Sequence, residues 1–153
     1  MRIVAQRASM GQVVVDGKIV GRLPAPGLVL LVGVTHEDTS AIAEKMASKI
    51  WGLRILENPE GVTPEAWSRG DVSASDINAP LLVISQFTLY GDTRKGRRPS
   101  WDAAAKADVA QPVFDHFVGT LRTLGAHVET GIFGALMEVT LTNTGPVTLI
   151  LEV

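Results

Sequence analysis

The most constraining feature of the sequence is a run of seven residues, Leu28 to Val34, that contains no polar side chain. A strand that is apolar at every position has to be covered on both faces, whereas a half-exposed strand alternates with polar residues. A membrane span needs about 18 consecutive apolar residues, so this run is too short to be one. We therefore expect a buried central strand in a sheet that is covered on both sides.

Two helices with apolar stripes can supply part of that cover. Ile42, Met46, Ile50 and Leu53 follow one another at intervals of four, four and three residues, which predicts an amphipathic helix packed on the sheet. A second stripe consists of Phe114, Phe117, Val118 and Leu121. Pro112 is suited to the first position of this second helix and Gly125 to its end. His116 lies off the stripe, so we expect it on the surface.

The ends of the chain predict further strands. Strands are expected at Met1 to Gln6 and at Gln12 to Val15, with Asp16-Gly17 as a two-residue hairpin turn into Lys18 to Leu23. Near the other end, Met137, Val139 and Leu141 alternate with polar residues, which is typical of a half-buried strand. We expect Asn143 to Pro146 to break this strand and Val147 to Val153 to form the terminal one.

The middle of the chain holds one more strand and one irregular stretch. Leu81 to Ile84 reads as a buried strand, and Asn58 to Asn78 as a long surface excursion with little regular structure. The sequence thus predicts the α/β class, with a mixed, mostly antiparallel sheet and helices packed on one side. A length of 153 residues fits a single domain spanning residues 1–153.

The composition narrows the chemistry. The chain has no cysteine, which excludes disulfides, thiolate nucleophiles and cysteine-bound zinc. His36, His116 and His127 lack metal-ligand spacing, so we expect neither a metal nor a cofactor. Hydrophobic residues make up 46% and charged residues 20%, as in ordinary globular proteins. Without a membrane segment or a signal peptide at the start of the sequence, we expect a cytoplasmic protein with no membrane partner.

A local group of cations is the one feature of the charge pattern that points to nucleic acid. The formal net charge is −2, so the chain lacks the basic character of a general DNA-binding domain and no DNA partner is expected. Arg94-Lys95-Gly96-Arg97-Arg98, however, places four cations within five residues. On charge alone, this segment can be either a solvated loop or a contact for phosphates.

Two short motifs carry most of the functional information. Ser85-Gln86-Phe87-Thr88-Leu89 follows the predicted strand at Leu81 to Ile84, and Asn143-Thr144-Gly145-Pro146-Val147-Thr148 interrupts the C-terminal strands. Taken alone, the first motif is a core strand running into a loop, and Gly145-Pro146 is an ordinary turn. Together and in this order, the two motifs resemble those of the D-aminoacyl-tRNA deacylases, also known as the D-tyrosyl-tRNA deacylase family. The resemblance runs from Met1 to Val153.

The resemblance implies a fold and a reaction. Members of this family form compact domains of α/β/β layers that pair as homodimers. They hydrolyse the ester between tRNA and a D-amino acid, and also glycyl-tRNA, including glycine mischarged on tRNA-Ala, in a form of chiral proofreading. By similarity, Ser85, Gln86, Phe87 and Thr88 form the catalytic floor of a pocket for the 3′-terminal adenosine, whose 2′-hydroxyl assists the reaction.

The resemblance also implies binding roles for other residues. Phe133, Ala135 and Met137 correspond to the adenine side of the pocket, although Phe133 and Met137 can equally be core residues. Asn143, Gly145, Pro146 and Thr148 belong to the substrate-binding motif, in which the Gly-Pro bond is cis. Two carbonyls of this turn hold the substrate ammonium, the turn excludes an L side chain, and it reaches into the pocket of the other subunit. Lys95 and Arg97 match a segment that contacts RNA phosphates.

The residues leave more than one chemical route open. Ester hydrolysis needs donors for the developing oxyanion, which backbone N–H groups around Gln86 and Phe87 can supply. Nothing places a histidine beside Ser85 or Thr88 and there is no Gly-x-Ser-x-Gly elbow, so a catalytic triad is not expected. Thr88 as nucleophile would need a base that the sequence does not show. The alternatives are a non-catalytic module that binds tRNA 3′ ends and a general small-ester hydrolase that uses Thr88.

Overall fold

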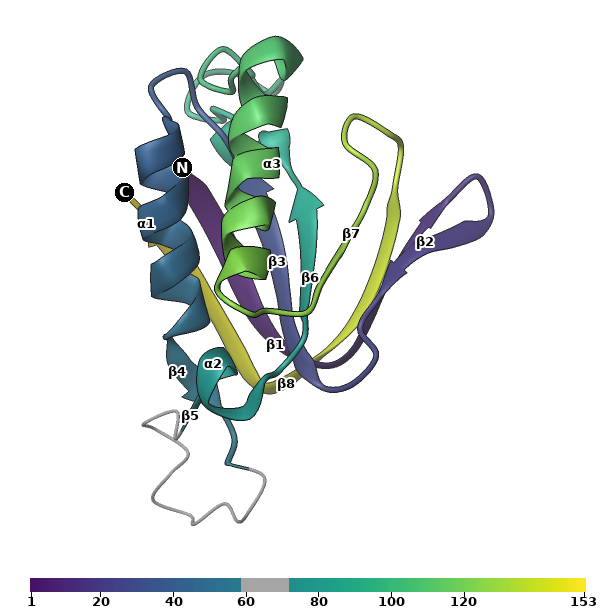
Figure 1. Cartoon of the computed structure of the whole chain (residues 1–153). Helices are drawn as coiled ribbons and strands as arrows, with labels where there is room; N and C mark the ends of the chain where they lie inside the picture. Colours follow the sequence, from purple (N-terminus) through teal and green to yellow (C-terminus); the bar gives the residue numbers. More distant parts are fainter. Residues whose placement is uncertain (59–71) are drawn as a thin grey trace.

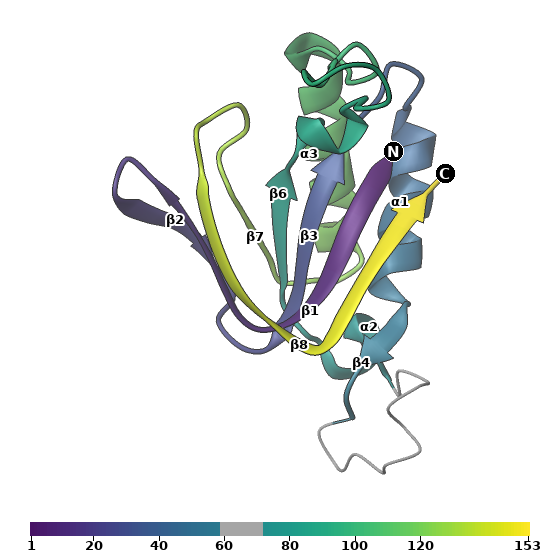
Figure 2. The ribbon, with the colours of Figure 1, turned by 180° about the vertical axis from the view of Figure 1, so that it is seen from behind.

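The protein has a mixed α/β fold in which a curved six-stranded sheet carries helices on one face (Figures 1 and 2). The structure is a computed structural model and describes residues 1–58 and 72–153. The sheet has the order β2-β1-β3-β6-β7, and the sixth strand, β8, lies off this path and pairs with β1. Its strands are β1 (Arg2–Val15), β2 (Lys18–Arg22), β3 (Gly27–Gly33), β6 (Leu81–Ser85), β7 (Val128–Thr130) and β8 (Glu138–Glu152). The pairs β3–β6 and β6–β7 are parallel and the pairs of β1 are antiparallel, which confirms the predicted mixed sheet.

The apolar run forms β3, and both of its faces are buried as predicted. Leu28, Leu30 and Val32 face the larger core, which lies between the sheet and the helices. Val29 and Leu31 face a second, smaller core on the other side of the sheet. The curvature of the sheet encloses this second core, because it brings β2 against β7. A Cβ atom on Gly21 of β2 would lie 2.3 Å from the carbonyl oxygen of Thr130 in β7.

The helices cover the larger core. α1 (Ser40–Trp51) and α3 (Ala107–Thr123) lie side by side on one face of the sheet (Figure 1). The Thr39 side chain caps α1 by accepting a hydrogen bond from the amide of Ile42. The predicted stripes are confirmed in both helices, although Leu53 lies just beyond the end of α1. His116 is partly exposed and pairs with Glu44 of α1.

The predicted start of the second helix is wrong. α3 begins at Ala107, so Pro112 lies inside it. A proline there lacks the N–H group that would bond to the carbonyl four residues earlier. The early turn forms nevertheless, because Ala110 and Val113 extend the buried stripe, and the amide of Ala110 donates to the carbonyl of Lys106 at 2.8 Å. The predicted end is correct, since Gly125 follows the helix with a φ of +98°.

Three predictions about the strands need correction. β1 and β8 are each continuous, where breaks were expected after Gln6 and at Asn143. β1 is held from both edges, so pairing keeps the small and polar residues between its two apolar halves extended. β8 accommodates its motif as a bulge, described below. The third correction concerns the irregular excursion expected from Asn58 to Asn78, of which residues 59–71 lie outside the described residues. The end of this segment is regular: it forms β5 (Val72–Ser73), followed by the short helix α2 (Ala74–Ile77). β5 pairs with β4 (Arg54–Leu56).

Candidate active site

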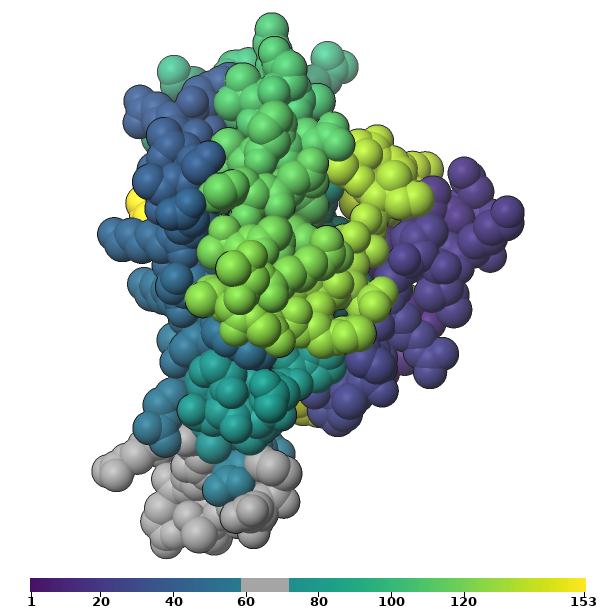
Figure 3. Space-filling view, viewed as in Figure 1, coloured from purple at the N-terminus to yellow at the C-terminus, as the bar shows by residue number. Residues whose placement is uncertain are grey.

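A pocket of about 370 Å³ opens where β3 and β6 end, between α3 and the loop of residues 131–137. Parallel strands deliver their carboxyl ends to the same edge of a sheet, which is where ligands commonly bind in α/β folds. In the space-filling view the 131–137 loop, in yellow-green, projects beside α3 (Figure 3). The residues that line the pocket are Val32, Val34, Ile84, Ser85, Gln86, Phe87, Ala105, Ala107, Ala110, Phe114, Phe133, Gly134, Ala135, Leu136, Met137 and Val139.

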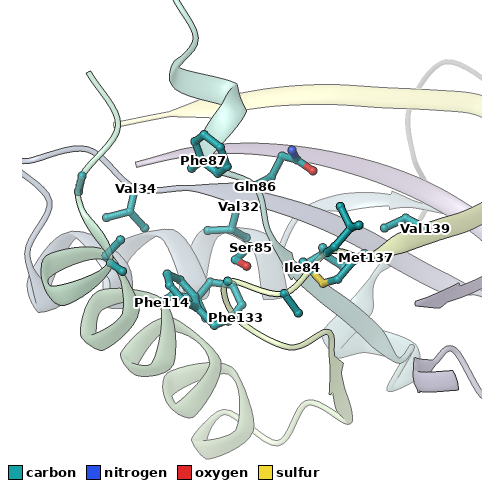
Figure 4. Close-up of a pocket in the computed structure, with 16 residues that line it drawn as sticks. Val32, Val34, Ile84, Ser85, Gln86, Phe87, Phe114, Phe133, Met137 and Val139 are labelled. Carbon is teal, nitrogen blue, oxygen red and sulfur yellow. The ribbon is translucent and has the colours of Figure 1, made fainter. Parts of the chain in front are cut away.

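The first three residues of the first motif, Ser85 to Phe87, form one wall of this pocket. Ser85 ends β6, and Phe87 begins a short 3₁₀ helix, η2 (Phe87–Tyr90). The Ser85 hydroxyl points toward Phe133, whereas the Gln86 side chain extends to the opposite side (Figure 4). No hydrogen bond to the Ser85 hydroxyl is recorded within residues 1–58 and 72–153, so this group is available to a ligand.

The backbone donors of the motif differ from what the sequence suggested. The amide of Gln86 donates to the carbonyl of Val32 at 2.7 Å, so it is committed to the sheet and unavailable for an oxyanion. The amides of Phe87 and Thr88 lie in the first turn of η2, where a helix provides no acceptor of its own. These two amides, unlike that of Gln86, can therefore donate hydrogen bonds to a ligand.

Thr88 does not line the pocket. Its hydroxyl accepts a hydrogen bond from the Gln86 side-chain amide. None of the sixteen lining residues is ionisable. The three histidines contact groups elsewhere: His36 the carbonyl of Asp102, His116 the Glu44 carboxylate and His127 the Glu129 carboxylate. Within residues 1–58 and 72–153, the Thr88 hydroxyl is thus paired with an amide and not with a base, and none of the histidines forms a Ser–His–acid triad.

The 131–137 loop brings Phe133, Ala135 and Met137 into the lining of the pocket. Phe133 also packs against Phe114 of α3, with ring centroids 5.8 Å apart. Sequence reasoning counted Phe114 only as a core residue and did not foresee Val32 and Val34 at the site. Their pattern signals burial, and only the tertiary arrangement shows that the same side chains also floor a pocket.

The second motif, Asn143–Thr148, forms a bulge in β8. Ala8 of β1 pairs with Asn143 and Gln6 pairs with Thr148, so the residues between them have only Arg7 opposite. The Gly145-Pro146 peptide bond is cis, as expected, and Gly145 has a φ of +109°. The guanidinium of Arg7 lies against this turn, donating to the carbonyl of Thr144 at 3.1 Å.

Asn143 and Thr148 brace the bulge from within. The side-chain NH2 of Asn143 donates to the backbone carbonyls of Arg7 at 2.9 Å and of Val147 at 2.8 Å. The Thr148 hydroxyl donates to the side-chain oxygen of Asn143 at 3.4 Å and accepts from the Gln6 side chain at 3.2 Å. Gly145, Pro146, Asn143 and Thr148 do not line the pocket of their own chain. A single chain thus does not bring the two motifs together.

The cationic residues lie in a loop at residues 93–99, hereafter the cationic loop. Backbone hydrogen bonds between Asp92 and Ser100, at 2.8 and 2.9 Å, close its base. Arg94 is engaged by Asp92, with side-chain contacts of 2.9 and 2.7 Å. Hydrogen bonds from the Arg94 side chain and amide lower the pKa of Asp92 to about 2. Lys95 and Arg97 are exposed and form no ion pair within the part of the chain that the structure describes.

Arg2 and Tyr90 fix the far end of η2. The Arg2 guanidinium donates to the carbonyl of Leu89, pairs with Glu152 and lies 4.8 Å from the centroid of the Tyr90 ring. Burial and the nearby Asp38 carboxylate raise the pKa of Tyr90 to about 12. Tyr90 therefore stays neutral across the physiological range, and the contacts of Arg2 tie the end of η2 to β1.

Comparison with known proteins places this arrangement in a family. The family described as D-Tyr-tRNA(Tyr) deacylase matches residues 4–152. The chain belongs to this family. D-aminoacyl-tRNA deacylase of Cutibacterium acnes is 59% identical over 99% of this chain and 97% of its own length, and that of Thermobifida fusca is 58% identical over 100% of both chains. The expectation of a deacylase, an enzyme of the hydrolase class, is confirmed.

Solved structures support the same fold. The c-Myc DNA unwinding element binding protein is similar with a TM-score of 0.87 and 32% identity, over 100% of this chain and 99% of that one. A probable eukaryotic D-amino acid tRNA deacylase has a TM-score of 0.84 over 99% and 98% of the two chains, at 17% identity.

Neither a metal cluster nor a membrane helix is found in the described ranges. Outside residues 59–71, no group of three or more His, Cys, Asp or Glu side chains could hold a metal ion. No helix among the same residues is long and apolar enough to cross a membrane.

Proposed function

We propose that residues 1–153 form a single catalytic domain and that the protein is a cytoplasmic chiral-proofreading enzyme. It hydrolyses D-aminoacyl-tRNA and glycyl-tRNA to free amino acid and tRNA. The observation that carries the proposal is the pocket that Ser85, Gln86 and Phe87 build with Phe133 to Met137, in a chain that belongs to the deacylase family over almost its whole length. Its volume falls within the roughly 300–1,000 Å³ typical of small-ligand sites. Its apolar, aromatic walls suit the face of an adenine base.

The chemistry follows from the groups that the pocket has and lacks. Because none of the lining residues is ionisable, residues 1–58 and 72–153 place no general base in this pocket. The 2′-hydroxyl of the terminal adenosine instead orients the attacking water and relays its proton to the departing 3′-oxygen, so that the ester gives free amino acid and a tRNA 3′-hydroxyl. The amide of Phe87 and the Ser85 hydroxyl are donors for the oxyanion that develops on the carbonyl, and such donors stabilise the transition state strongly in a site shielded from water.

Chiral selection requires the second motif, and a homodimer can deliver it. Pro146 is exposed on β8, and Ile150 of the same strand is 68% exposed. Within residues 1–58 and 72–153, β8 pairs with β1 and with no other strand. A second subunit seated on this strand would receive the Gly145-Pro146 turn in its pocket. There the turn carbonyls hold the substrate ammonium, and the turn occupies the volume that an L side chain needs. Glycine, which has no side chain to reject, is accepted.

The direct test compares D-tyrosyl-tRNA, L-tyrosyl-tRNA and glycyl-tRNA with the same purified protein. Steric exclusion should favour the D ester over the L ester on the order of a thousandfold in rate, about 4 kcal/mol. Glycyl-tRNA should be hydrolysed as well. Equal hydrolysis of the two tyrosyl enantiomers would refute the rejection model.

Subunit sharing is tested by mixing two impaired variants and comparing the mixture with each variant alone. One carries a change at Phe87 and the other carries Gly145→Ala, and shared sites predict that the mixture is more active than either parent. If each site combines the first motif of one chain with the second motif of the other, a mixed dimer holds one doubly altered site and one intact site. Activity should then rise on subunit exchange. No recovery, despite exchange demonstrated with labelled subunits, would place both motifs in one subunit's pocket.

The same assays separate the competing functions. A non-catalytic module for tRNA 3′ ends would bind D-tyrosyl-tRNA without releasing free tyrosine. A general ester hydrolase with Thr88 as nucleophile would leave a trappable acyl-enzyme and act on small esters. The proposed enzyme releases free D-tyrosine without an acyl-enzyme, and duplex DNA should not compete with its substrate.

A further inference from the structure

Trp101 lies directly after the cationic loop and contacts the pocket wall. Its ring meets that of Phe87 edge to face, with centroids 5.4 Å apart and an interplanar angle of 72°. The indole also lies so close to Gly91 that a Cβ atom there would be 2.6 Å from its Cζ3 atom. Trp101 is thus packed between the end of η2 and the side chain of Phe87, while 43% of it remains exposed.

Phe87 needs such a partner, because little else fixes its side chain. It lines the pocket, yet 56% of it is exposed, and η2 has no buried residue. Trp101 provides the one ring contact recorded for Phe87 within residues 1–58 and 72–153. Edge-to-face packing sets both the position and the tilt of an aromatic ring.

Trp101 is in turn fixed by the loop that precedes it. Ser100, its neighbour, makes both backbone hydrogen bonds to Asp92 that close the cationic loop. The carbonyl of Trp101 accepts from the amide of Ala104 at 2.9 Å, and the amide of Ala105 donates to the carbonyl of Val34 at the pocket floor. The cationic loop, Trp101 and the pocket wall are therefore joined by a short series of direct contacts.

We propose that Trp101 is a positioning residue that holds Phe87 as the pocket wall and sets it relative to the cationic loop. This inference rests on the proposed function. An acceptor strand held by its phosphates at Lys95 and Arg97 would then enter the pocket at a defined distance from Phe87. Trp101 acts through Phe87, so its effect reaches substrates that never touch the loop.

The first test uses two substrates, D-tyrosyl-tRNA and 2′(3′)-O-D-tyrosyl adenosine, which carries no phosphate. Trp101→Ala should lower kcat/KM about tenfold for both, and Trp101→Phe should recover most of the loss because a ring edge is restored. An effect confined to the tRNA substrate would mean that Trp101 serves only the loop, and would overturn the proposal. Unaltered kinetics of Trp101→Ala on both substrates would overturn it as well.

A second test moves the indole without altering Trp101 or Phe87. The φ of Gly91 is −66°, which any residue can adopt, so Gly91→Ala acts chiefly by displacing the indole. The Thr88 carbonyl, 3.1 Å from the added Cβ, contributes a smaller part that does not depend on Trp101. Gly91→Ala should lower kcat/KM for the adenosine ester about tenfold in the wild-type background and less than threefold in the Trp101→Ala background.

Equal losses in the two backgrounds would show that Gly91 and Trp101 act independently, against the proposal. The wild-type protein distinguishes this failure from that of the proposed function. If it does not hydrolyse either D-tyrosyl ester, both inferences fall. If it does, and the variants behave independently, only the role of Trp101 is refuted.

Discussion

Replacing Gly145 with alanine is the sharpest test of the second motif, because the structure shows what the new methyl group would meet. The Cβ atom would lie 2.3 Å from Nη2 of Arg7 and 3.0 Å from Cγ2 of Val147. The φ of +109° is also one that L side chains rarely adopt. The substitution therefore combines backbone strain with displacement of the Arg7 guanidinium from the turn.

The two contributions differ in size and in kind. Backbone strain of this type costs about 1–3 kcal/mol. Moving Arg7 weakens its hydrogen bond to the Thr144 carbonyl, worth about 1.5–3 kcal/mol for a charged donor. Its 3.1 Å ion pair with the half-exposed Glu57 adds about 0–1 kcal/mol. The part specific to Arg7 is thus about 1.5–4 kcal/mol.

Gly125→Ala is the matched control. Gly125 has a similar φ of +98°, but no atom lies within 4 Å of its Cβ position and it follows α3 away from the pocket. It should carry the backbone strain alone. In thermal unfolding, Gly145→Ala should melt about 3–16 °C below Gly125→Ala, since 1 kcal/mol corresponds to about 2–4 °C at this size.

Activity should separate the pair more clearly. Gly145→Ala should lower kcat/KM for D-tyrosyl-tRNA about 10- to 100-fold, or about 1.4–2.7 kcal/mol, while Gly125→Ala stays within about twofold of wild type. Equal activity and equal melting temperatures for the two variants would show that the Arg7 contact does not hold the turn in its working position.

Three further predictions address the first motif and the cationic loop. Thr88→Ala should retain substantial activity, whereas a 2′-deoxy terminal adenosine should abolish it; the reverse outcome in kinetic assays would restore Thr88 as nucleophile. The double substitution Lys95→Ala and Arg97→Ala should raise KM more than it lowers kcat. For the wild-type protein, a plot of log KM against log salt concentration should have a slope of about 1.4, the value for two phosphate contacts on a single strand, and the double variant should have a smaller slope. Equal slopes for the two proteins would show that the cationic loop is only a solvated loop. Arg94→Ala should raise the pKa of Asp92 from about 2 toward its ordinary value of 3.8 in an NMR titration. Because the pKa of Asp92 is lower in the folded state, the Asp92–Arg94 pair stabilises the cationic loop fully above about pH 4, and this stabilisation is lost as the pH falls toward 2. An Asp92 pKa that is the same with and without Arg94 would contradict the prediction.

The sequence predicted those elements whose signals are local. The positive φ values at Asp16 and Gly17 are what the Asp-Gly hairpin turn requires, and the apolar run at β3 has the two buried faces that its composition demands. The stripes of α1 and α3 are likewise set by spacing along one helix face. In each case the residues that determine the structure are neighbours in the sequence.

The errors arose where distant partners override local preference. Pro112 and the second motif both carry signals that end a regular element, and both lie inside one. In α3, burial of the early turn outweighs the missing N–H group. In β8, side chains from β1 and from the motif itself support the bulge, so the strand resumes in register at Thr148. The sequence does not display these partners, because Arg7 and Thr144 are 137 residues apart.

The same difference between local signals and distant partners explains which features of the site the sequence predicted. The first motif could be placed at the end of a strand from its neighbours alone. The hydrogen bond from the Gln86 amide to the Val32 carbonyl depends on the parallel pairing of β3 with β6, which the sequence does not display. That pairing leaves the amides of Phe87 and Thr88 as the free donors and aims the Ser85 hydroxyl at Phe133. It also leaves a pocket whose lining, within residues 1–58 and 72–153, contains no ionisable side chain, which is why the proposed mechanism takes its reactive hydroxyl from the substrate. A site of this composition favours a substrate that carries its own hydroxyl next to the ester, as the 3′ end of an aminoacylated RNA does and its deoxy counterpart does not.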